Sequence, residues 1–117
     1  MPIRTLAILA VLMVAGGTTT AADTRSDARG QVEFGIAVAQ KGLWGEATYR
    51  WERAVDIDPS YAAAWNNLGI AYEHDGLFDK ARDAYERALD LEPGNTMIQQ
   101  NYDLFREIND RINQSDR

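Results

Sequence analysis

The strongest constraint on the fold is an internal repeat, in which position n is matched by position n + 34. Residues 31–38 read QVEFGIAV and residues 65–72 read WNNLGIAY, and the segments RWERAVDIDP and AYERALDLEP keep the same offset. Small residues and prolines recur in matching places: Gly35 and Gly69, Ala37 and Ala71, Gly42 and Gly76, Ala47 and Ala81, Ala54 and Ala88, Pro59 and Pro93. A fixed period of this length is typical of stacked supersecondary units that bury a shared core.

Each unit is expected to be a pair of helices. Apolar side chains recur every three or four positions, as at Trp65, Leu68 and Tyr72, which is the spacing of one helix face and not the alternation of a strand. The repeated glycine, Gly76 in the second unit, separates the two helices. The repeated proline, Pro93, ends the unit because its nitrogen cannot donate a hydrogen bond in a helix interior.

The second unit also matches a known repeat signature. The residues that match it in type and spacing are Trp65, Leu68, Gly69, Tyr72, Ala81, Tyr85, Ala88 and Pro93. They resemble the tetratricopeptide repeat. The first unit resembles it more loosely, with Gln31 in place of the tryptophan and Val38 in place of the tyrosine. The resemblance implies a right-handed superhelix of antiparallel helix pairs, with one repeat at 28–61 and the next at 62–95.

The small residues have a packing reason that is independent of the resemblance. Glycine and alanine let neighbouring helix axes approach closely, while Trp51 and Tyr85 fill the space between units. Gly69 is therefore expected to resist replacement by a larger side chain. Trp51 and Trp65 lie on apolar stripes and are expected in the core, and Trp44 is expected to pack near a turn.

The period fails from Thr96 onward, because position 103 is aspartate where glycine is expected. Apolar residues still recur at helical spacing, at Ile98, Tyr102, Phe105, Ile108 and Ile112. They predict a C-terminal capping helix with a short tail over 96–117, whose polar outer face keeps a solenoid soluble. Thr96 is expected to cap this helix, and Asp79 to cap the second helix of the second unit.

The predicted fold class is therefore an all-α solenoid of two antiparallel helix-turn-helix repeats with a C-terminal capping helix.

Residues 1–22 have the build of an export signal peptide. Arg4 supplies a positive start, residues 6–15 are an uninterrupted apolar run, and small residues follow up to Ala22, the expected cleavage point. The run is about half the roughly 20 residues that a helix needs to cross a bilayer, so removal is favoured over a retained anchor. Residues 23–27 are then a flexible N-terminal segment. We expect an exported protein, periplasmic or secreted, with no stable membrane insertion after signal removal.

Composition excludes cysteine-based crosslinks and disfavours two classes of anionic partner. The chain has no cysteine, so neither a disulfide framework nor a lipid-modified cysteine can form. Loss of Arg4 with the signal leaves 11 of the 12 basic side chains against 18 acidic ones. The resulting negative charge disfavours binding to nucleic acid or to anionic lipid.

No residue pattern points to catalysis, a metal or a cofactor. The one histidine, His74, is expected on the surface near the C-terminal end of a repeat helix. The neighbouring Glu73 and Asp75 lack the spacing of a calcium loop. Ser60 and Ser115 have no histidine or acid at a spacing that suggests a triad. The protein is therefore expected to be noncatalytic, without a cofactor or a metal.

The resemblance implies a binding surface, since members of the family commonly hold peptides in a concave groove lined by the first helix of each repeat. Carried over position by position, the candidate groove residues are Arg29, Val32, Ile36, Gln40, Asn66, Ile70, Glu73 and His74. Ile36 and Ile70 stand where asparagines that help to clamp a C-terminal carboxylate are often found, so such a clamp is not expected here.

The predicted function is noncatalytic protein–protein interaction, as an exported adaptor or accessory subunit. The partner is expected to be a peptide segment or protein with apolar anchors and some basic residues, because the chain is acidic. An apolar stripe on the first helix, with Val32 and Ile36, needs cover from a partner, a second copy or the preceding segment. The alternative is therefore a self-associating structural subunit of an assembly outside the cytoplasm, a homodimer that buries this stripe.

Overall fold

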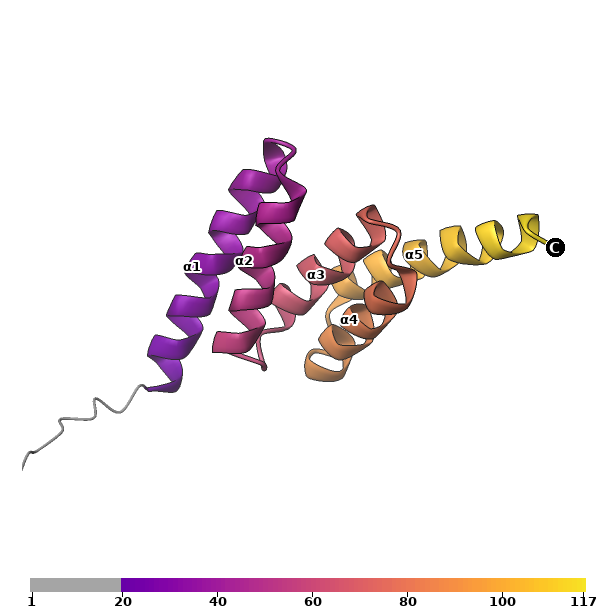
Figure 1. Ribbon diagram of the computed structural model, residues 1–117. Helices are drawn as coiled ribbons and strands as arrows, with labels where there is room; N and C mark the ends of the chain where they lie inside the picture. The colour runs from indigo at the N-terminus through magenta and orange to yellow at the C-terminus, as the bar shows by residue number, and fades with distance from the viewer. Residues whose placement is uncertain (1–19) are drawn as a thin grey trace, which may run out of the picture.

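The computed structural model describes residues 20–117, which form five helices and no strands (Figure 1). The helices are α1 (Ala21–Gln40), α2 (Trp44–Ile57), α3 (Ala62–His74), α4 (Phe78–Leu91) and α5 (Thr96–Ser115). α1 packs along α2, α3 packs along α4, and α5 lies against α4 and also touches α3. The predicted all-α solenoid of helical repeats with a C-terminal helix is confirmed.

Each helix pair is held together by an aromatic ring seated over a glycine. A Cβ atom added at Gly35 would lie 2.3 Å from Nε1 of Trp51, and one added at Gly69 would lie 2.8 Å from the ring of Tyr85. Both rings are buried. The Trp51 Nε1 donates a hydrogen bond to the carbonyl of Val32 (3.1 Å), which fixes the indole against α1. The contact between a glycine and an aromatic ring therefore occurs once in each repeat, at positions 34 residues apart.

The turns inside the repeats depend on glycine for a different reason. Gly42 and Gly76 have φ values of 79° and 73°, in the left-handed region that favours glycine over residues with a side chain. The following amides, of Leu43 and Leu77, return to carbonyls of the preceding helix at 3.0 and 2.8 Å. These turns end α1 and α3 and reverse the chain direction.

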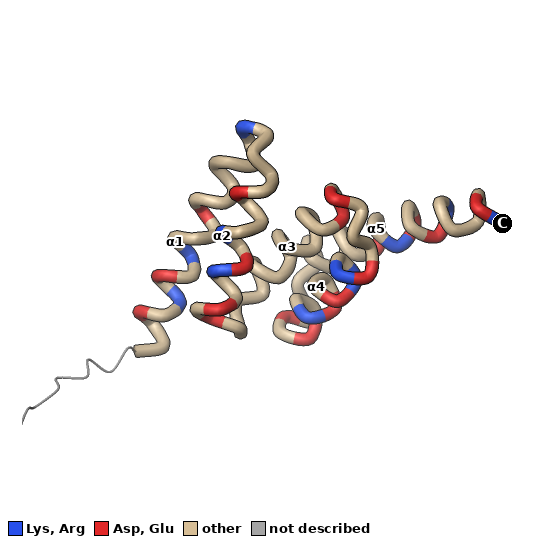
Figure 2. Tube along the Cα trace, viewed as in Figure 1, with Lys and Arg blue, Asp and Glu red and all other residues tan. Residues whose placement is uncertain are grey.

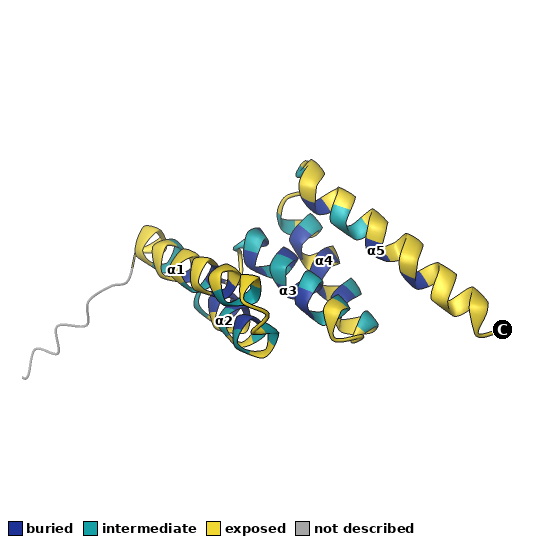
Figure 3. Cartoon of the chain, turned by 90° about the horizontal axis from the view of Figure 1, so that it is seen from above, coloured by how far each residue is buried: buried dark blue, intermediate teal, exposed yellow. Residues whose placement is uncertain are grey.

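The core runs from one repeat into the next. One buried cluster joins Val32, Trp51 and Val55 of the first repeat to Leu68 and neighbouring alanines of the second. A further cluster joins Tyr85 of α4 to Phe105 of α5, with ring centroids 5.5 Å apart. Figure 3 shows that burial on α5 ends well before its C-terminus. α5 therefore packs on the second repeat with the part of the helix that runs from Ile98 to Asn109.

Residues 23–27 lie inside α1, so the prediction of a flexible segment is wrong. Arg25 explains the order: its Nε donates to Oδ2 of Asp58 (2.6 Å), and its Nη2 donates to the carbonyl of Ser60 (3.3 Å). The guanidinium also lies over the ring of Tyr61, 4.6 Å from the centroid. The start of α1 is thereby tied to the end of the first repeat.

Two predicted caps are also wrong. Asp79 lies in the first turn of α4, where the N-cap is Leu77 and no side chain caps the helix. Thr96 is the first residue of α5, and the cap is its neighbour Asn95, whose Oδ1 accepts from the amides two and three positions later (3.1 and 3.2 Å). That is the usual geometry of an N-cap.

The predicted signal peptide falls mostly outside the described residues, which begin at Thr20. The Thr20 side chain caps α1 by accepting from the amide of Asp23 (3.2 Å), so cleavage after Ala22 would fall in the first turn of this helix. From Thr20 to the C-terminus, no helix is both long and apolar enough to cross a bilayer.

The glycine–aromatic contact predicts opposite outcomes for two glycine substitutions. Gly69→Ala should lower the free energy of unfolding by roughly 1 to 3 kcal/mol, because the new methyl group meets a buried ring. Gly30→Ala should raise it by up to about 1 kcal/mol, since Gly30 is in a helix and nothing lies near its Cβ position. Urea unfolding followed by circular dichroism measures both, and a Gly69→Ala protein as stable as its parent would contradict the register.

The Asp58 contacts predict a dependence of stability on pH. Hydrogen bonds from the Ser60 side chain and from Arg25 hold the pKa of Asp58 below its usual value. A lowered native pKa stabilises the fold above pH ~4, and this contribution is lost as the pH falls through the native pKa. Asp58→Asn should therefore cost about 1 to 2 kcal/mol at pH 7 and much less near pH 3.

The exposed neighbour Asp56 provides the control for that measurement. It lies at the end of α2, two positions before Asp58, and is exposed, so Asp56→Asn should leave the stability at pH 7 within about 0.5 kcal/mol of the parent. Equal effects of the two substitutions across the pH range would show that Asp58 makes no special contribution.

Candidate functional site

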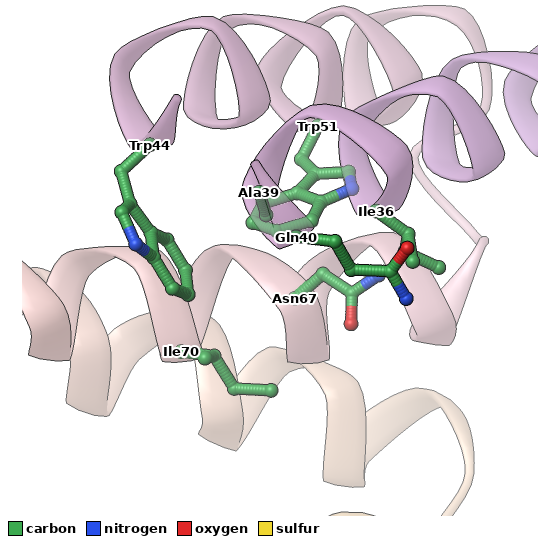
Figure 4. Close-up of a pocket in the computed structure, with 7 residues that line it drawn as sticks. All are labelled: Ile36, Ala39, Gln40, Trp44, Trp51, Asn67 and Ile70. Carbon is green, nitrogen blue, oxygen red and sulfur yellow. The ribbon is translucent and has the colours of Figure 1, made fainter. Parts of the chain in front are cut away.

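An apolar pocket opens between α1 and α3, next to the start of α2. Its volume is about 310 Å³, at the lower end of the range for ligand pockets. Figure 4 shows the side chains that line it, which are Ile36, Ala39, Gln40, Trp44, Trp51, Asn67 and Ile70. None of them is charged. The pocket can therefore accept a neutral apolar group, with the amides of Gln40 and Asn67 able to hydrogen-bond beside it.

The pocket occupies equivalent positions of successive first helices. Ile36 and Ile70 are one repeat period apart, and Leu104 of α5 follows after one more period. α3 starts at position 62 and α5 at position 96, which is the same offset, so the first turns of α5 keep the register of the repeat. α1 touches α3 and α3 touches α5. An apolar residue therefore recurs on each first helix along one face of the solenoid.

Trp44 forms one wall of the pocket through an aromatic stack. Its ring lies nearly parallel to that of His74, with centroids 4.2 Å apart and an interplanar angle of 14°. It also meets Trp51 edge-on, at 6.5 Å. The His74 Nδ1 lies 3.3 Å from Oδ1 of Asp75. The stack joins the beginning of α2 to the end of α3 and so sets how wide the pocket is at this end.

The structure brings together three of the eight predicted groove residues in the pocket lining: Ile36, Gln40 and Ile70. Arg29 is exposed on α1, about two turns before Ile36. His74 is half exposed, as predicted for a surface histidine, but it contributes to the site through its stack on Trp44.

Two predicted groove residues are buried instead, which corrects the prediction. Val32 is 5% exposed and Asn66 is 4% exposed. They occupy equivalent positions, rotated by about 40° around the helix from the groove-facing isoleucines. This rotation moves the side chain from the groove into the core. Val32 packs in the buried cluster shared by the two repeats. The Oδ1 of Asn66 accepts a hydrogen bond from Nδ2 of Asn101 on α5 (3.1 Å).

Glu73 is engaged inside its own repeat. Its Oε2 accepts a hydrogen bond from the Tyr85 hydroxyl (2.9 Å). Burial, together with the Glu73 carboxylate, raises the pKa of Tyr85, so this hydroxyl stays protonated and keeps donating. Glu73 therefore supports the packing of α4 on α3, and it is not among the residues that line the pocket.

Sequence reasoning missed four pocket residues, which are Ala39, Trp44, Trp51 and Asn67. Asn67 is adjacent to Asn66, and a helix turns by about 100° per residue, so the error of one position exchanged a groove residue for a buried one. The position of Trp44 could have predicted its role: it follows the Gly42 turn, where the chain reverses and a large side chain can reach back across the groove.

The site offers no arrangement for chemistry. The pocket lining contains no carboxylate, histidine or hydroxyl that could act as base or nucleophile. Within residues 20–117, no three side chains of the metal-ligating types gather in one place. What the geometry supports is reversible binding of an apolar group.

Comparison with known families agrees with this repeat architecture. Residues 62–95 match a family model described as tetratricopeptide repeat, and residues 35–76 match one described as TPR repeat. No curated protein matches the chain. The two matched segments together span residues 35–95, just over half of the chain, and they include α2, α3 and α4 completely. The chain therefore belongs to the tetratricopeptide repeat family.

Proposed function

We propose that this protein is a noncatalytic adaptor that holds an apolar side chain of a partner protein in the pocket between α1 and α3. Tetratricopeptide repeats generally mediate binding to protein partners, and the uncharged pocket is the observation that supports a particular site for it. Its lining exposes an isoleucine from each of two repeats and two amides that can bond a peptide backbone.

The charge distribution supports a partner with some basic residues around its apolar anchor. The described residues contain 11 basic and 18 acidic side chains. Figure 2 shows both signs spread over the helices, while α3 is almost free of charge. Its one carboxylate is Glu73. A partner segment would therefore meet an apolar floor inside an acidic protein, which favours apolar anchors flanked by lysine or arginine.

We further propose that the adaptor works outside the cytoplasm, in the periplasm or as a secreted protein. This part rests on the signal-like build of residues 1–22 alone. Cleavage after Ala22 would remove the Thr20 cap of α1, at a cost of about 1 kcal/mol. The Arg25 contacts lie beyond that point and would stay.

The alternative function is a structural subunit that pairs through the first-helix stripe, and this stripe is not a free apolar surface. Val32 is in the core, and Ile36 lines the pocket. Phe34, the other large exposed apolar residue of α1, is covered on one side by the guanidinium of Arg50, 4.2 Å from the ring centroid. Self-association would need another face of the molecule.

The groove proposal predicts a difference between two substitutions on α1. Peptides selected for binding from a random displayed library should share a large apolar residue, and Ile36→Asp should weaken their binding about tenfold or more. Phe34→Asp is the matched control, because Phe34 is similarly exposed two positions away and does not line the pocket. Fluorescence anisotropy of labelled peptides measures both affinities, and equal weakening by the two substitutions would place binding elsewhere.

The export proposal predicts a shortened protein outside the cytoplasm. The intact mass of the exported chain should correspond to residues 23–117. Leu9→Arg, which interrupts the apolar run, should keep the chain full-length and inside the cell. Recovery of the uncleaved parent in the cytoplasm would contradict export.

A further inference from the structure

α5 carries an apolar stripe that no other part of residues 20–117 covers. Leu104, Ile108 and Ile112 are spaced four positions apart and are 57%, 39% and 40% exposed. Another side of the helix faces the bundle through Ile98 and Phe105, which are buried. Figures 1 and 3 show the last turns of α5 projecting beyond the other helices. The stripe begins at Leu104, beside the packed part of the helix, and extends onto the projecting turns, where Ile112 lies.

The stripe is not the place where a further repeat helix would pack. In the second repeat, Gly69 makes room for Tyr85 of the second helix. The equivalent position of α5 is Asp103, and its helix face continues with Arg106 and Asp110, which are exposed and polar. A helix packed there would take three charged side chains out of water, which carries a desolvation cost. The apolar stripe therefore needs a partner of another kind.

The order of residues along the stripe is symmetrical about Ile108. Leu104 precedes it by four positions and Ile112 follows it by four. If two α5 helices pair antiparallel about a two-fold axis at Ile108, Leu104 of each copy packs against Ile112 of the other, and the two Ile108 side chains meet. Each stripe is then covered by the stripe of the other copy.

The charges beside the stripe suit the same arrangement. Glu107 and Arg111 form an ion pair along its solvent edge. In an antiparallel pair related by a two-fold axis, this edge of one helix meets the same edge of the other, so Glu107 of each copy faces Arg111 of its partner. Residues 96–117 contain four acidic and three basic side chains, against 14 and eight in residues 20–95. Self-repulsion is therefore least at α5.

The projection of α5 leaves room for a second copy. The last turns of one helix would lie alongside residues 101–107 of the other, and the two helix bundles would sit at opposite ends of the pair. We infer that the protein forms a two-fold dimer through antiparallel pairing of α5. One helix pair is smaller than the usual stable interface, so a micromolar dissociation constant is expected. The inference does not depend on the partner in the α1–α3 pocket.

Cysteine crosslinking of the full chain tests the register, because the protein contains no cysteine. Ile108→Cys should form a disulfide-linked dimer under mild oxidation. Leu104→Cys and Ile112→Cys should each stay monomeric alone and crosslink when mixed. Met97→Cys is the control: it is exposed on the same helix but has no counterpart in the pair. A Leu104→Cys homodimer, or crosslinking at Met97 to the same extent, would overturn the proposal.

Sedimentation equilibrium of the unmodified full chain tests association without any substitution. The mass should rise from monomer to dimer with concentration, and Ile108→Glu should raise the dissociation constant about tenfold or more. Met97→Glu should leave it unchanged. A monomer at every concentration up to about 1 mM would overturn the inference, and so would a dimer that Ile108→Glu leaves intact while circular dichroism shows unchanged helix content.

Discussion

The seating of an aromatic ring over a helix glycine is the contact on which the rest of the structure depends. Trp51 over Gly35 and Tyr85 over Gly69 bring the two helices of each repeat to a separation that a Cβ atom would prevent. The rings then form the surface on which the next element packs, as Phe105 of α5 packs on Tyr85. This one contact, made twice, therefore sets the spacing of α1 against α2 and of α3 against α4, and α5 packs on the second ring.

The two proposed binding surfaces follow from which residues face away from that core. On α1 and α3 the helix face next to the ring contact carries Ile36 and Ile70, and Trp44 closes the space between them, so a pocket forms where the repeats meet. On α5 the same register continues with Leu104, and the stripe extends onto the projecting turns. The same repeat position therefore lines the pocket through Ile36 and Ile70, and it contributes Leu104 to the exposed stripe of α5.

The sequence alone predicted the features that depend on spacing. Residue spacing located the helix pairs and the C-terminal helix, and it marked Gly69 as a position of close helix approach. It could not resolve rotations of about 40° to 100° around a helix axis, which decide whether Val32, Asn66 or Asn67 faces the groove. It also could not show contacts between distant residues, such as Arg25 with Asp58, and so the start of α1 was mistaken for a flexible segment.

The most direct test of the central claim, that the α1–α3 pocket holds a partner, is site-specific photocrosslinking in cells that produce the full chain. A photoreactive phenylalanine analogue placed at position 36 should give an adduct, and mass spectrometry should locate the link at a large apolar residue of one partner peptide. The same analogue at position 34, outside the pocket, should give none of this adduct. Equal labelling of one partner from both positions, or no adduct from position 36, would contradict the account.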